Sequence, residues 1–517
     1  MEKEVTSYLL LLSVFRHKSI TGDRMKYLFS GYEMKNWERQ AMEDYKTPSL
    51  LLMERAAMAV VDELLSGIYD LHRILIACGT GNNGGDGLAI ARMLKTKGYF
   101  VDVCIAGALD RLTPDAKQQL EMYQAISGNF VTDPVYHEYT VIVDALFGIG
   151  CNREIVGIAA DVIQGINESK VPVVSVDVPS GISADTGKIC GCAVNAVTTV
   201  TFFTEKLGMM LYPGNEHCGK IMVADMGIPV GTPEKCNVIT YDETDLEKLP
   251  KRRNNSHKGS YGKVLVIAGS PTISGAAYLS ACAAYRMGSG LVKIFTSQEN
   301  KQSMQVLLPE ALIETYDRGR LSTKQINQCL EWADVVVLGP GLGTDKTAEK
   351  LVKYVLGKSK VPVVVDADGI NIIAKTKTCL LDEHAPLVLT PHIQEMARLL
   401  GCDREKILND PMLVAKDFVK EYNVVLVLKD ARTIVIEKEQ TLYINVSGNN
   451  GMATGGSGDV LSGMIGSLIG QGMVPFEAAK LGVYLHGRAG DAASEVKGMY
   501  SMTATDLLNG IFEVTKI

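Results

Sequence analysis

Short apolar runs, each followed by a glycine-rich or polar cluster, recur along most of this sequence. They are rich in valine, isoleucine and leucine with little polar alternation, which is typical of strands buried on both faces of a parallel sheet. They cover residues 73–78, 100–106, 140–144, 171–177, 263–270, 334–338, 361–366, 387–390 and 424–428. Helical spacing of apolar residues is found at 32–40, 49–65 and 88–97. The pattern predicts two successive α/β series.

The periodic pattern lapses between about residues 227 and 259, where several prolines precede the polar run 251–255. A chain of 517 residues has enough material for two or three domains. We predict four parts, namely an extension at 1–24, a domain at 25–230, a linker at 231–256 and a domain at 257–517. The apolar run 9–15 is too short to span a bilayer and no cleavage site follows it, which favours an extension upstream of a start at Met25.

The long glycine-rich loop from Gly448 to Asp459 follows a predicted strand at 441–446 and leads into a predicted buried helix at 460–465. Its glycines let the backbone turn tightly, and the N–H groups at the start of a helix attract an anion. Asp459 is then in the first helical turn, beside the anion. A glycine-rich turn with Asp459 as the N-cap would give the same pattern. A carboxylate beside an anion site suits phosphoryl transfer, and we favour that interpretation.

Polar residues also follow the predicted strands of the first half, at Asp86, Asp144, Asp177 and Ser180. In open α/β sheets ligands bind beyond the carboxyl ends of the strands, so these residues predict a site. The spacing Gly79-x-Gly81-x-x-Gly84 also fits a dinucleotide fingerprint, which leaves a hydride-transferring Rossmann domain as an alternative. In the second half, His392 follows a predicted strand, where it is either a structural histidine or a ligand contact.

The charge and the cysteine and histidine content exclude several classes of function. The net charge is -7, which argues against a nucleic-acid binder. The 11 cysteines include no Cys-x-x-Cys pair, as expected for reduced thiols in the cytoplasm, and the 8 histidines form no His-Glu-x-x-His motif. We therefore expect a cytoplasmic protein without a transition-metal site, a nucleic-acid partner or a membrane span.

Two families are recognisable in these motifs. The first half resembles the NAD(P)H-hydrate epimerase domain at Asn82-Asn83-Gly84-Gly85-Asp86, at Asp144 and at Asp177-x-x-Ser180. The second half is similar to the ADP-dependent NAD(P)H-hydrate dehydratase from His257-Lys258-Gly259 to Gly455-Gly456-Ser457-Gly458-Asp459. Together the halves resemble the bifunctional NAD(P)H-hydrate repair enzymes. The resemblance implies two three-layer α/β domains, an N-terminal Rossmann-like epimerase domain and a C-terminal ribokinase-like domain.

The resemblance also implies an activity and its sites. The N-terminal half would interconvert the R and S forms of hydrated NADH and NADPH, and the C-terminal half would dehydrate the S form with ADP, giving AMP and phosphate. The implied catalytic residues are Asp144 and Asp459, and K⁺ would be held by Asn83, Asp144 and Ser180. In the epimerase half, the substrate contacts would be Asn82, Asn83, Gly84, Gly85, Asp86, Gly148, Ile149, Gly150, Cys151, Asn152, Arg153, Glu154 and Asp177.

In the dehydratase half, Mg²⁺ would accompany ADP. The whole protein is expected to be a homo-oligomer. The implied substrate contacts are Ala276, Gly341, Gly343, His392 and Asp459, and the implied nucleotide contacts are Lys429, Asp430, Ala431, Arg432, Thr433 and Gly458. The sequence departs from the family pattern twice, since Asp430 replaces the usual glycine and Ile393-Gln394 the usual Pro-Gly. A metabolite kinase fused to a binding module and a Rossmann dehydrogenase with an accessory domain are the competing functions.

Overall fold

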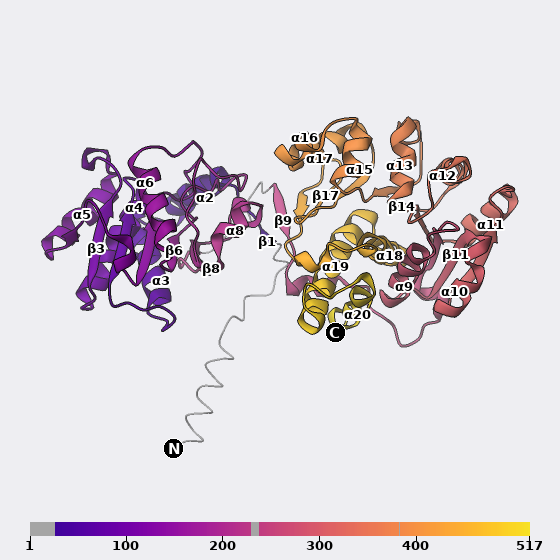
Figure 1. The fold of residues 1–517 in the computed structure, drawn as a ribbon, viewed down its shortest axis with the longest axis horizontal. Coiled ribbons are helices and arrows are strands. Elements are labelled where there is room, and N and C mark those ends of the chain that lie inside the picture. The colour runs from indigo at the N-terminus through magenta and orange to yellow at the C-terminus, as the bar shows by residue number, and fades with distance from the viewer. Residues whose placement is uncertain (1–25, 229–236, 382, 517) are drawn as a thin grey trace, which may run out of the picture.

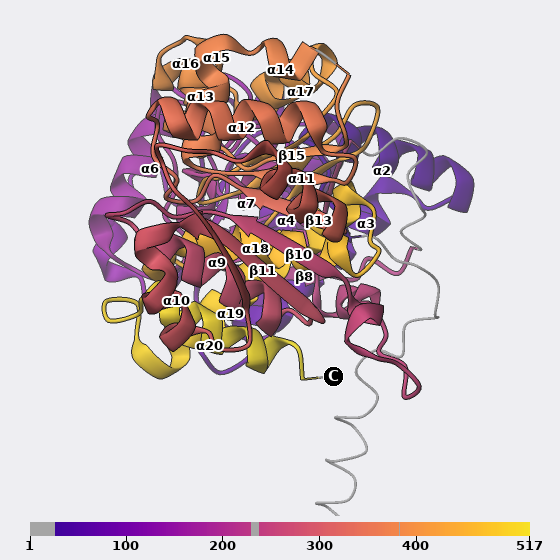
Figure 2. The same cartoon turned by 90° about the vertical axis from the view of Figure 1, so that its right-hand side faces the viewer.

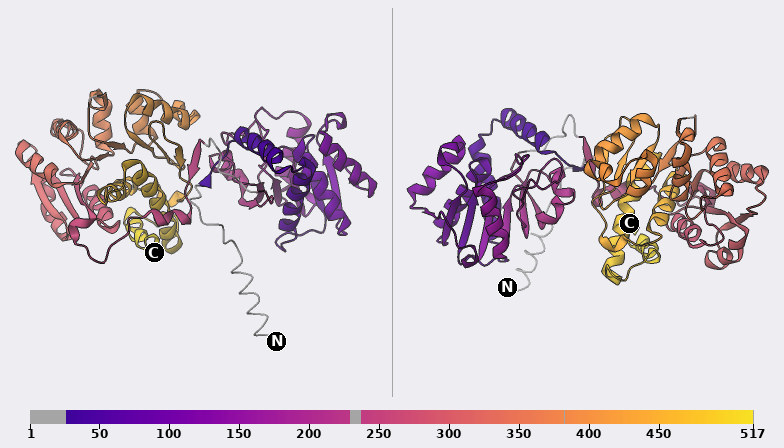
Figure 3. Two further views of the ribbon diagram at one scale, coloured as in Figure 1. Left: turned by 180° about the vertical axis from the view of Figure 1, so that it is seen from behind. Right: turned by 45° about the horizontal axis from the view of Figure 1, so that its top comes forward.

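The protein forms two α/β modules, which lie side by side in Figures 1 and 3. The structure is a computed structural model that describes residues 26–228, 237–381 and 383–516. We call residues 28–228 the N-terminal module and residues 237–516 the C-terminal module. The predicted extension at 1–24, the start at Met25 and positions 231–236 of the predicted linker lie outside the described residues.

The N-terminal module contains a seven-stranded parallel sheet in the order β4-β3-β2-β5-β6-β7-β8. Its strands are β2(Ile74–Cys78), β3(Val101–Ile105), β4(Asn129–Phe130), β5(Val141–Ala145), β6(Val173–Val176), β7(Thr198–Phe202) and β8(Lys220–Ala224). Its helices are α2(Gly31–Tyr45), α3(Ser49–Leu64), α4(Asn82–Thr96), α5(Pro114–Ala125), α6(Ile158–Ser169), α7(Leu207–Met210) and α8(Gly214–Cys218).

Helices cover both faces of this sheet. Along β2, Ile74 and Ile76 pack with the helices α3, α4 and α5, whereas Leu75 and Ala77 pack with α6 on the other face. The central strands are therefore buried on both faces, and this accounts for the unbroken apolar runs in the sequence.

The C-terminal module contains an eleven-stranded sheet in the order β1-β9-β18-β17-β16-β15-β14-β13-β10-β11-β12. In this sheet order, the seven strands that begin with β16 and end with β12 are parallel to one another. β17 pairs antiparallel with both β16 and β18. The strands are β1(Lys26–Tyr27), β9(Val238–Thr240), β10(Lys263–Ile267), β11(Leu291–Ser297), β12(Leu312–Tyr316), β13(Val335–Leu338), β14(Val363–Val365), β15(Leu387–Leu389), β16(Val425–Leu428), β17(Ile434–Ile436) and β18(Leu442–Ile444).

This sheet also has a helical layer on each face, and Figure 2 shows them above and below the strands. Val264 and Val266 of β10 pack against α9, α18, α19 and α20, while Leu265 and Ile267 pack against the opposite layer. The helices are α9(Gly275–Arg286), α10(Lys301–Leu307), α11(Thr323–Trp332), α12(Lys346–Lys358), α13(Asp368–Thr376), α14(Thr378–Leu381), α15(Ile393–Leu400), α16(Arg404–Asn409), α17(Pro411–Glu421), α18(Ser457–Gly470), α19(Pro475–Lys497) and α20(Ala504–Val514). The predicted fold class, two three-layer α/β units, is confirmed.

Two short strands belong to a different part of the fold from the one in which the predicted boundaries place them. β1, placed by sequence in the first domain, pairs antiparallel with β9, and both belong to the sheet of the C-terminal module. β9 itself lies inside the predicted linker at 231–256. Strands of two and three residues carry no readable periodicity, and their pairing joins segments more than two hundred positions apart.

Candidate active sites

The glycine-rich loop of the C-terminal module ends where α18 begins, at Ser457. Its N-cap is Gly456, whose φ of +90 is the left-handed conformation that glycine adopts without strain. Asp459 is the third residue of the helix and not its cap, so the simple capping interpretation is wrong. The first N–H groups of α18 have no partner within the helix, as the predicted anion site requires.

Side chains of α19 hold this glycine-rich loop in place through hydrogen bonds. Gly448 N and Asn449 Nδ2 each donate to the Asp491 carboxylate at 3.0 Å. The ring of His486 is buried, and its Nε2 lies 3.0 Å from the Ser457 carbonyl at the start of α18. Burial lowers the pKa of His486 to about 4, so this imidazole stays neutral. None of these supporting contacts is predictable from the local sequence.

A lysine–aspartate pair lies under the first turn of α18. Lys429, at the end of β16, is 2.7 Å from the Oδ1 atom of Asp366, which follows β14 and is 1% exposed. A Cβ atom added to Gly458 would lie only 3.1 Å from Lys429 Nζ, so glycine leaves room for this cation. The structure thus brings together Lys429 and Gly458, two implied nucleotide contacts from separate segments. It also adds Asp366, to which the sequence analysis gave no role.

Asp459 lies at the edge of this group. The pKa of its carboxyl is raised to about 7, chiefly by burial and then by the negative charges of Asp366, Asp368 and Glu395, with Lys429 opposing them. A carboxylate that titrates near neutral pH is an efficient general base, because it accepts a proton without being held charged by its surroundings. This property is a feature of the assembled strand ends and cannot be read from the loop sequence.

His392 has the structural role that the sequence left open. It is the N-cap of α15, where its Nδ1 accepts hydrogen bonds from Gln394 N at 3.0 Å and Glu395 N at 3.4 Å. Glu395 in turn accepts from His392 N at 2.9 Å, which completes a capping box. The imidazole side chain is 50% exposed, so it is also accessible to a ligand.

The remaining implied contacts of this half occupy neighbouring strand ends. Gly341 has a φ of +60 after β13, and a Cβ there would lie 2.9 Å from the Cβ of Ala276 in α9. Gly343 N donates to Asp368 at 2.8 Å. In the loop after β16, Asp430 and Ala431 are exposed, whereas the Arg432 side chain is directed to the N-terminal module.

In the N-terminal module, the segment from Asn82 to Asp86 is the start of α4, whereas the apolar spacing in the sequence predicts a helix only from Leu88. Glycine makes this early start possible, because a Cβ at Gly84 would lie 1.9 Å from the Gly79 carbonyl oxygen and would prevent the close approach of helix and strand. Asn83 is buried, and its Nδ2 has no hydrogen-bond partner among the described residues. An unpaired buried amide is costly, so this group is suited to a ligand.

Asp144 and Ser180 form a buried cluster at the ends of β5 and β6. Asp144 Oδ2 accepts from Ser180 N at 2.9 Å and Ser175 Oγ at 2.8 Å, and Ser180 Oγ donates to Oδ1 at 2.5 Å. Burial raises the pKa of Asp144, and these hydrogen bonds lower it. Within the part of the chain that the structure describes, no basic side chain forms an ion pair with Asp144.

A second charged cluster in this module contains two residues that the sequence analysis missed. Lys206 is 0% exposed and lies 2.6 Å from Asp177 Oδ1, and Asp177 Oδ2 accepts from Ile149 N at 3.2 Å. The pKa of Glu38 in α2 is raised to about 7, chiefly by burial and also by the charge of Asp177, with Lys206 opposing them. Burial also raises the pKa of Asp86, helped by Asp177 and Glu38. Helical spacing gave no sign that Glu38 faces this cluster.

The comparisons identify the two modules. Residues 49–208 match the family model described as YjeF-related protein N-terminus, and residues 264–513 match that of NAD(P)H-hydrate dehydratase. The bifunctional NAD(P)H-hydrate repair enzyme of Moorella thermoacetica is 40% identical over 510 residues, which cover 93% of this chain and 95% of that protein. The Escherichia coli enzyme of the same description is 35% identical over 482 residues, covering 92% of each chain.

The chain belongs to the bifunctional NAD(P)H-hydrate repair enzymes. The resemblance drawn from the sequence is therefore confirmed. A ribokinase-like superfamily protein from Enterococcus faecalis V583 is 27% identical, with a TM-score of 0.50, and covers 55% of this chain and 98% of that chain. This likeness agrees with the ribokinase-like fold expected for the C-terminal module. From here on we call the two modules of this repair enzyme the epimerase module and the dehydratase module.

The implied substrate loop of the epimerase module, Gly148 to Glu154, follows β5. A Cβ on Gly148 would lie 2.9 Å from Asp177 Oδ2 and 3.1 Å from Asn83 Oδ1, so the structure brings these implied contacts together. Cys151 is buried, and its carbonyl oxygen lies 3.9 Å from Cys190 Sγ. The implied contacts that follow it, Asn152, Arg153 and Glu154, are exposed.

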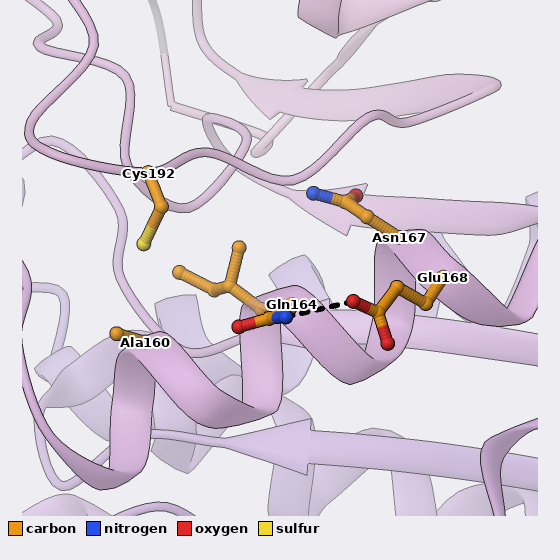
Figure 4. Close-up of a pocket in the computed structure, with 6 residues that line it drawn as sticks. Ala160, Gln164, Asn167, Glu168 and Cys192 are labelled. Atoms are coloured by element: carbon orange, nitrogen blue, oxygen red, sulfur yellow. Dashed lines mark hydrogen bonds between the residues drawn. The ribbon is translucent and has the colours of Figure 1, made fainter.

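The repair enzyme also has an open pocket between α6 and the segment that carries Cys192, shown in Figure 4. Its volume is about 440 Å³, and it is lined by Ala160, Ile163, Gln164, Asn167, Glu168 and Cys192. None of the implied site residues lines it. No helix among the described residues is long and apolar enough to cross a membrane, and these residues contain no cluster of three or more His, Cys, Asp or Glu that could hold a metal ion.

Proposed function

We propose that this enzyme repairs hydrated NADH and NADPH in two steps, each in its own module. The epimerase module interconverts the R and S forms, and the dehydratase module converts the S form to NAD(P)H with ADP as phosphoryl donor. The observation that carries the proposal is the position of Asp459. Its carboxyl has a pKa of about 7 and lies in the first turn of α18, beside the Lys429–Asp366 pair.

In the dehydratase module, the ring hydroxyl of the substrate gives its proton to Asp459 as the hydroxyl oxygen attacks the terminal phosphoryl group of ADP. The N–H groups at the start of α18 and the Lys429 ammonium stabilise the negative charge on that phosphoryl group. AMP leaves, and the phosphorylated ring then loses phosphate and a proton from the adjacent carbon, which restores the double bond. Phosphorylation is needed because hydroxide is a poor leaving group.

Mg²⁺ would neutralise charge on the nucleotide when bound. The carboxylates at this edge are Asp366, Asp368 and Glu395, and the described residues contain no preformed metal cage. This arrangement fits Mg²⁺, which is bound through one or two carboxylates together with substrate phosphates. The exposed Asp430 adds negative charge near the nucleotide and would weaken its binding.

In the epimerase module, the donors fit K⁺ and not a softer metal. The Asp144 carboxylate and the Ser180 hydroxyl are oxygen ligands, and a buried carboxylate with no ion pair gains from a nearby cation. Asn83 completes the implied ligand set. Because both Asp144 oxygens are already engaged, its surroundings support an ion-holding role over a proton-transfer role.

Proton movement on the substrate would then fall to the second cluster of the epimerase module. Asp86 and Asp177 are implied substrate contacts, Lys206 neutralises Asp177, and Glu38 titrates near neutral pH. A carboxyl group with a pKa of about 7 can give and take a proton under the same conditions, as interconversion of two epimers requires.

The test is incubation with hydrated NADH and ADP, following the return of NADH absorbance and the release of AMP. We expect NADH, AMP and phosphate in equal amounts. A stable phosphorylated product would instead identify a metabolite kinase, and a change in redox state without nucleotide consumption would identify a dehydrogenase.

Nine cysteines with described side chains are free thiols, which supports a cytoplasmic setting.

A further inference from the structure

The loop implied to bind the nucleotide is anchored by the other module. In this five-residue loop, 429–433, Lys429 is held inside the dehydratase module by Asp366 and by its N–H bond to the Pro391 carbonyl at 2.8 Å. Arg432, near the other end, crosses to the epimerase module. Its Nε donates to the Met210 carbonyl at 2.6 Å, and its Nη2 donates to Asn215 Oδ1 at 3.0 Å.

Each of the three nitrogens of the Arg432 guanidinium has a partner in this position. Its third nitrogen, Nη1, lies 3.3 Å from the Val446 carbonyl oxygen, and its central carbon lies 4.9 Å from the centre of the Tyr212 ring. All of these partners are neutral. These bonds use three of the five N–H donors of the side chain and tie the loop to the epimerase module and to Val446.

The receiving surface on the epimerase module is itself fixed. Asn215 donates to the Met209 carbonyl at 2.8 Å, which orients the side-chain oxygen that Arg432 uses. Leu207 N, at the start of α7, donates to the Phe29 carbonyl at 2.8 Å. Phe29 follows β1, the strand that pairs with β9. One apolar cluster runs from Met210 in α7 to Ile434 in β17, so the contact around Arg432 continues into a shared core.

We propose that the epimerase module positions the nucleotide-binding loop of the dehydratase module, with Arg432 as the positioning residue and Met210, Tyr212 and Asn215 as its anchor. The contact fixes the loop before the nucleotide arrives, so binding does not have to order it. This inference rests on the proposed nucleotide role of the loop. It makes nucleotide affinity in one module depend on a side chain of the other.

The test places the substitution outside the dehydratase module. In the full chain, Asn215→Leu removes the oxygen that Arg432 uses. Asn215→Asp keeps an acceptor for Arg432, loses the bond to Met209 and adds a negative charge beside the guanidinium. We expect Asn215→Leu to raise the Kd for ADP, measured by titration calorimetry, on the order of tenfold, as for a lost hydrogen bond to a charged group. Asn215→Asp should stay within about twofold of the parent protein.

Asn167→Leu is the matched control, because Asn167 bonds to Ala193 and Asn195 inside the epimerase module. The variant should leave the Kd for ADP unchanged. Epimerase activity and the melting temperature check the fold of Asn215→Leu, and Tyr212→Leu, at a residue 45% exposed, replaces it if that fold is lost. An ADP affinity within twofold of the parent in folded Asn215→Leu, or in folded Tyr212→Leu, overturns the proposal. Because ADP binding is measured without chemistry, this outcome is distinct from a failure of the repair reaction.

Discussion

Lys429 and Asp366 form an ion pair, 2.7 Å between Nζ and Oδ1, directly under the first turn of the helix that carries Asp459. The pair joins the ends of β14 and β16 and places one positive and one negative charge beside the proposed base. Both charges act on the Asp459 pKa in opposite directions, with Asp366 the larger influence. The chemistry proposed for the dehydratase module depends on this arrangement.

Asp459→Asn should abolish ADP-dependent recovery of NADH. Loss of a general base costs about 10² to 10⁴ in rate. The substitution is isosteric and removes a partly buried charge, so the melting temperature and the affinity for ADP should be nearly unchanged. Stopped assays for AMP and NADH measure the rate, and Asp417→Asn, at an exposed helical position, is the matched control. Recovery within a few-fold of the parent protein would remove Asp459 from the chemistry.

The pH dependence of the dehydratase step should follow Asp459. A base works only when deprotonated, so kcat/KM should rise about tenfold per pH unit below its pKa of about 7 and level off above it. Asp366 raises this pKa, and removing its charge also leaves Lys429 free to lower it. Asp366→Asn should therefore move the rising limb to lower pH. A pH–rate profile of both proteins decides the matter, and an unmoved limb would show that Asp366 does not influence the base.

Asp144→Asn should stop epimerisation and leave dehydration intact. The change removes the buried charge that would hold K⁺ and disturbs the hydrogen bonds with Ser175 and Ser180. Given mixed epimers and ADP, the variant should consume the S share at the normal rate and then stall, apart from spontaneous epimerisation.

Chiral analysis of the remaining substrate should find the R form. Adding Asp459→Asn protein, whose epimerase module is unchanged, should restart the reaction in the stalled mixture. If Asp144→Asn alone consumes both epimers at the parent rate, the epimerase module has been assigned the wrong step.

Lys206→Met should impair both the epimerase reaction and the stability of the protein. Lys206 is fully buried, and its loss leaves the Asp177 charge without its 2.6 Å partner, a change that costs about 3 to 5 kcal/mol in comparable sites. Lys26→Met is the control, since the Lys26–Glu205 pair is partly exposed and should contribute under about 1 kcal/mol. Urea unfolding of the two variants measures the difference. Equal unfolding free energies would show that the buried pair has no special role.

Much of the fold was predictable because its strands are buried on both faces. Residues 424–428 and 335–338 are apolar throughout, and each range contains a strand of the parallel sheet. The start of α4 at Asn82 was not predictable, since glycine has a poor helix propensity. Its helical conformation depends on packing against Gly79, which local sequence does not report.

By itself, the sequence determined the two α/β series, the glycine loop before α18, the placement of acids at strand ends and the family. These features are local, since periodicity and loop composition depend on neighbouring residues. The tertiary structure alone decided that Asp366 pairs with Lys429, that Lys206 and Glu38 join Asp177, and that Arg432 contacts the epimerase module. Each of these groupings joins residues from separate elements. Burial then shifts the pKa values of the titratable groups, because their desolvation exists only in the assembled fold.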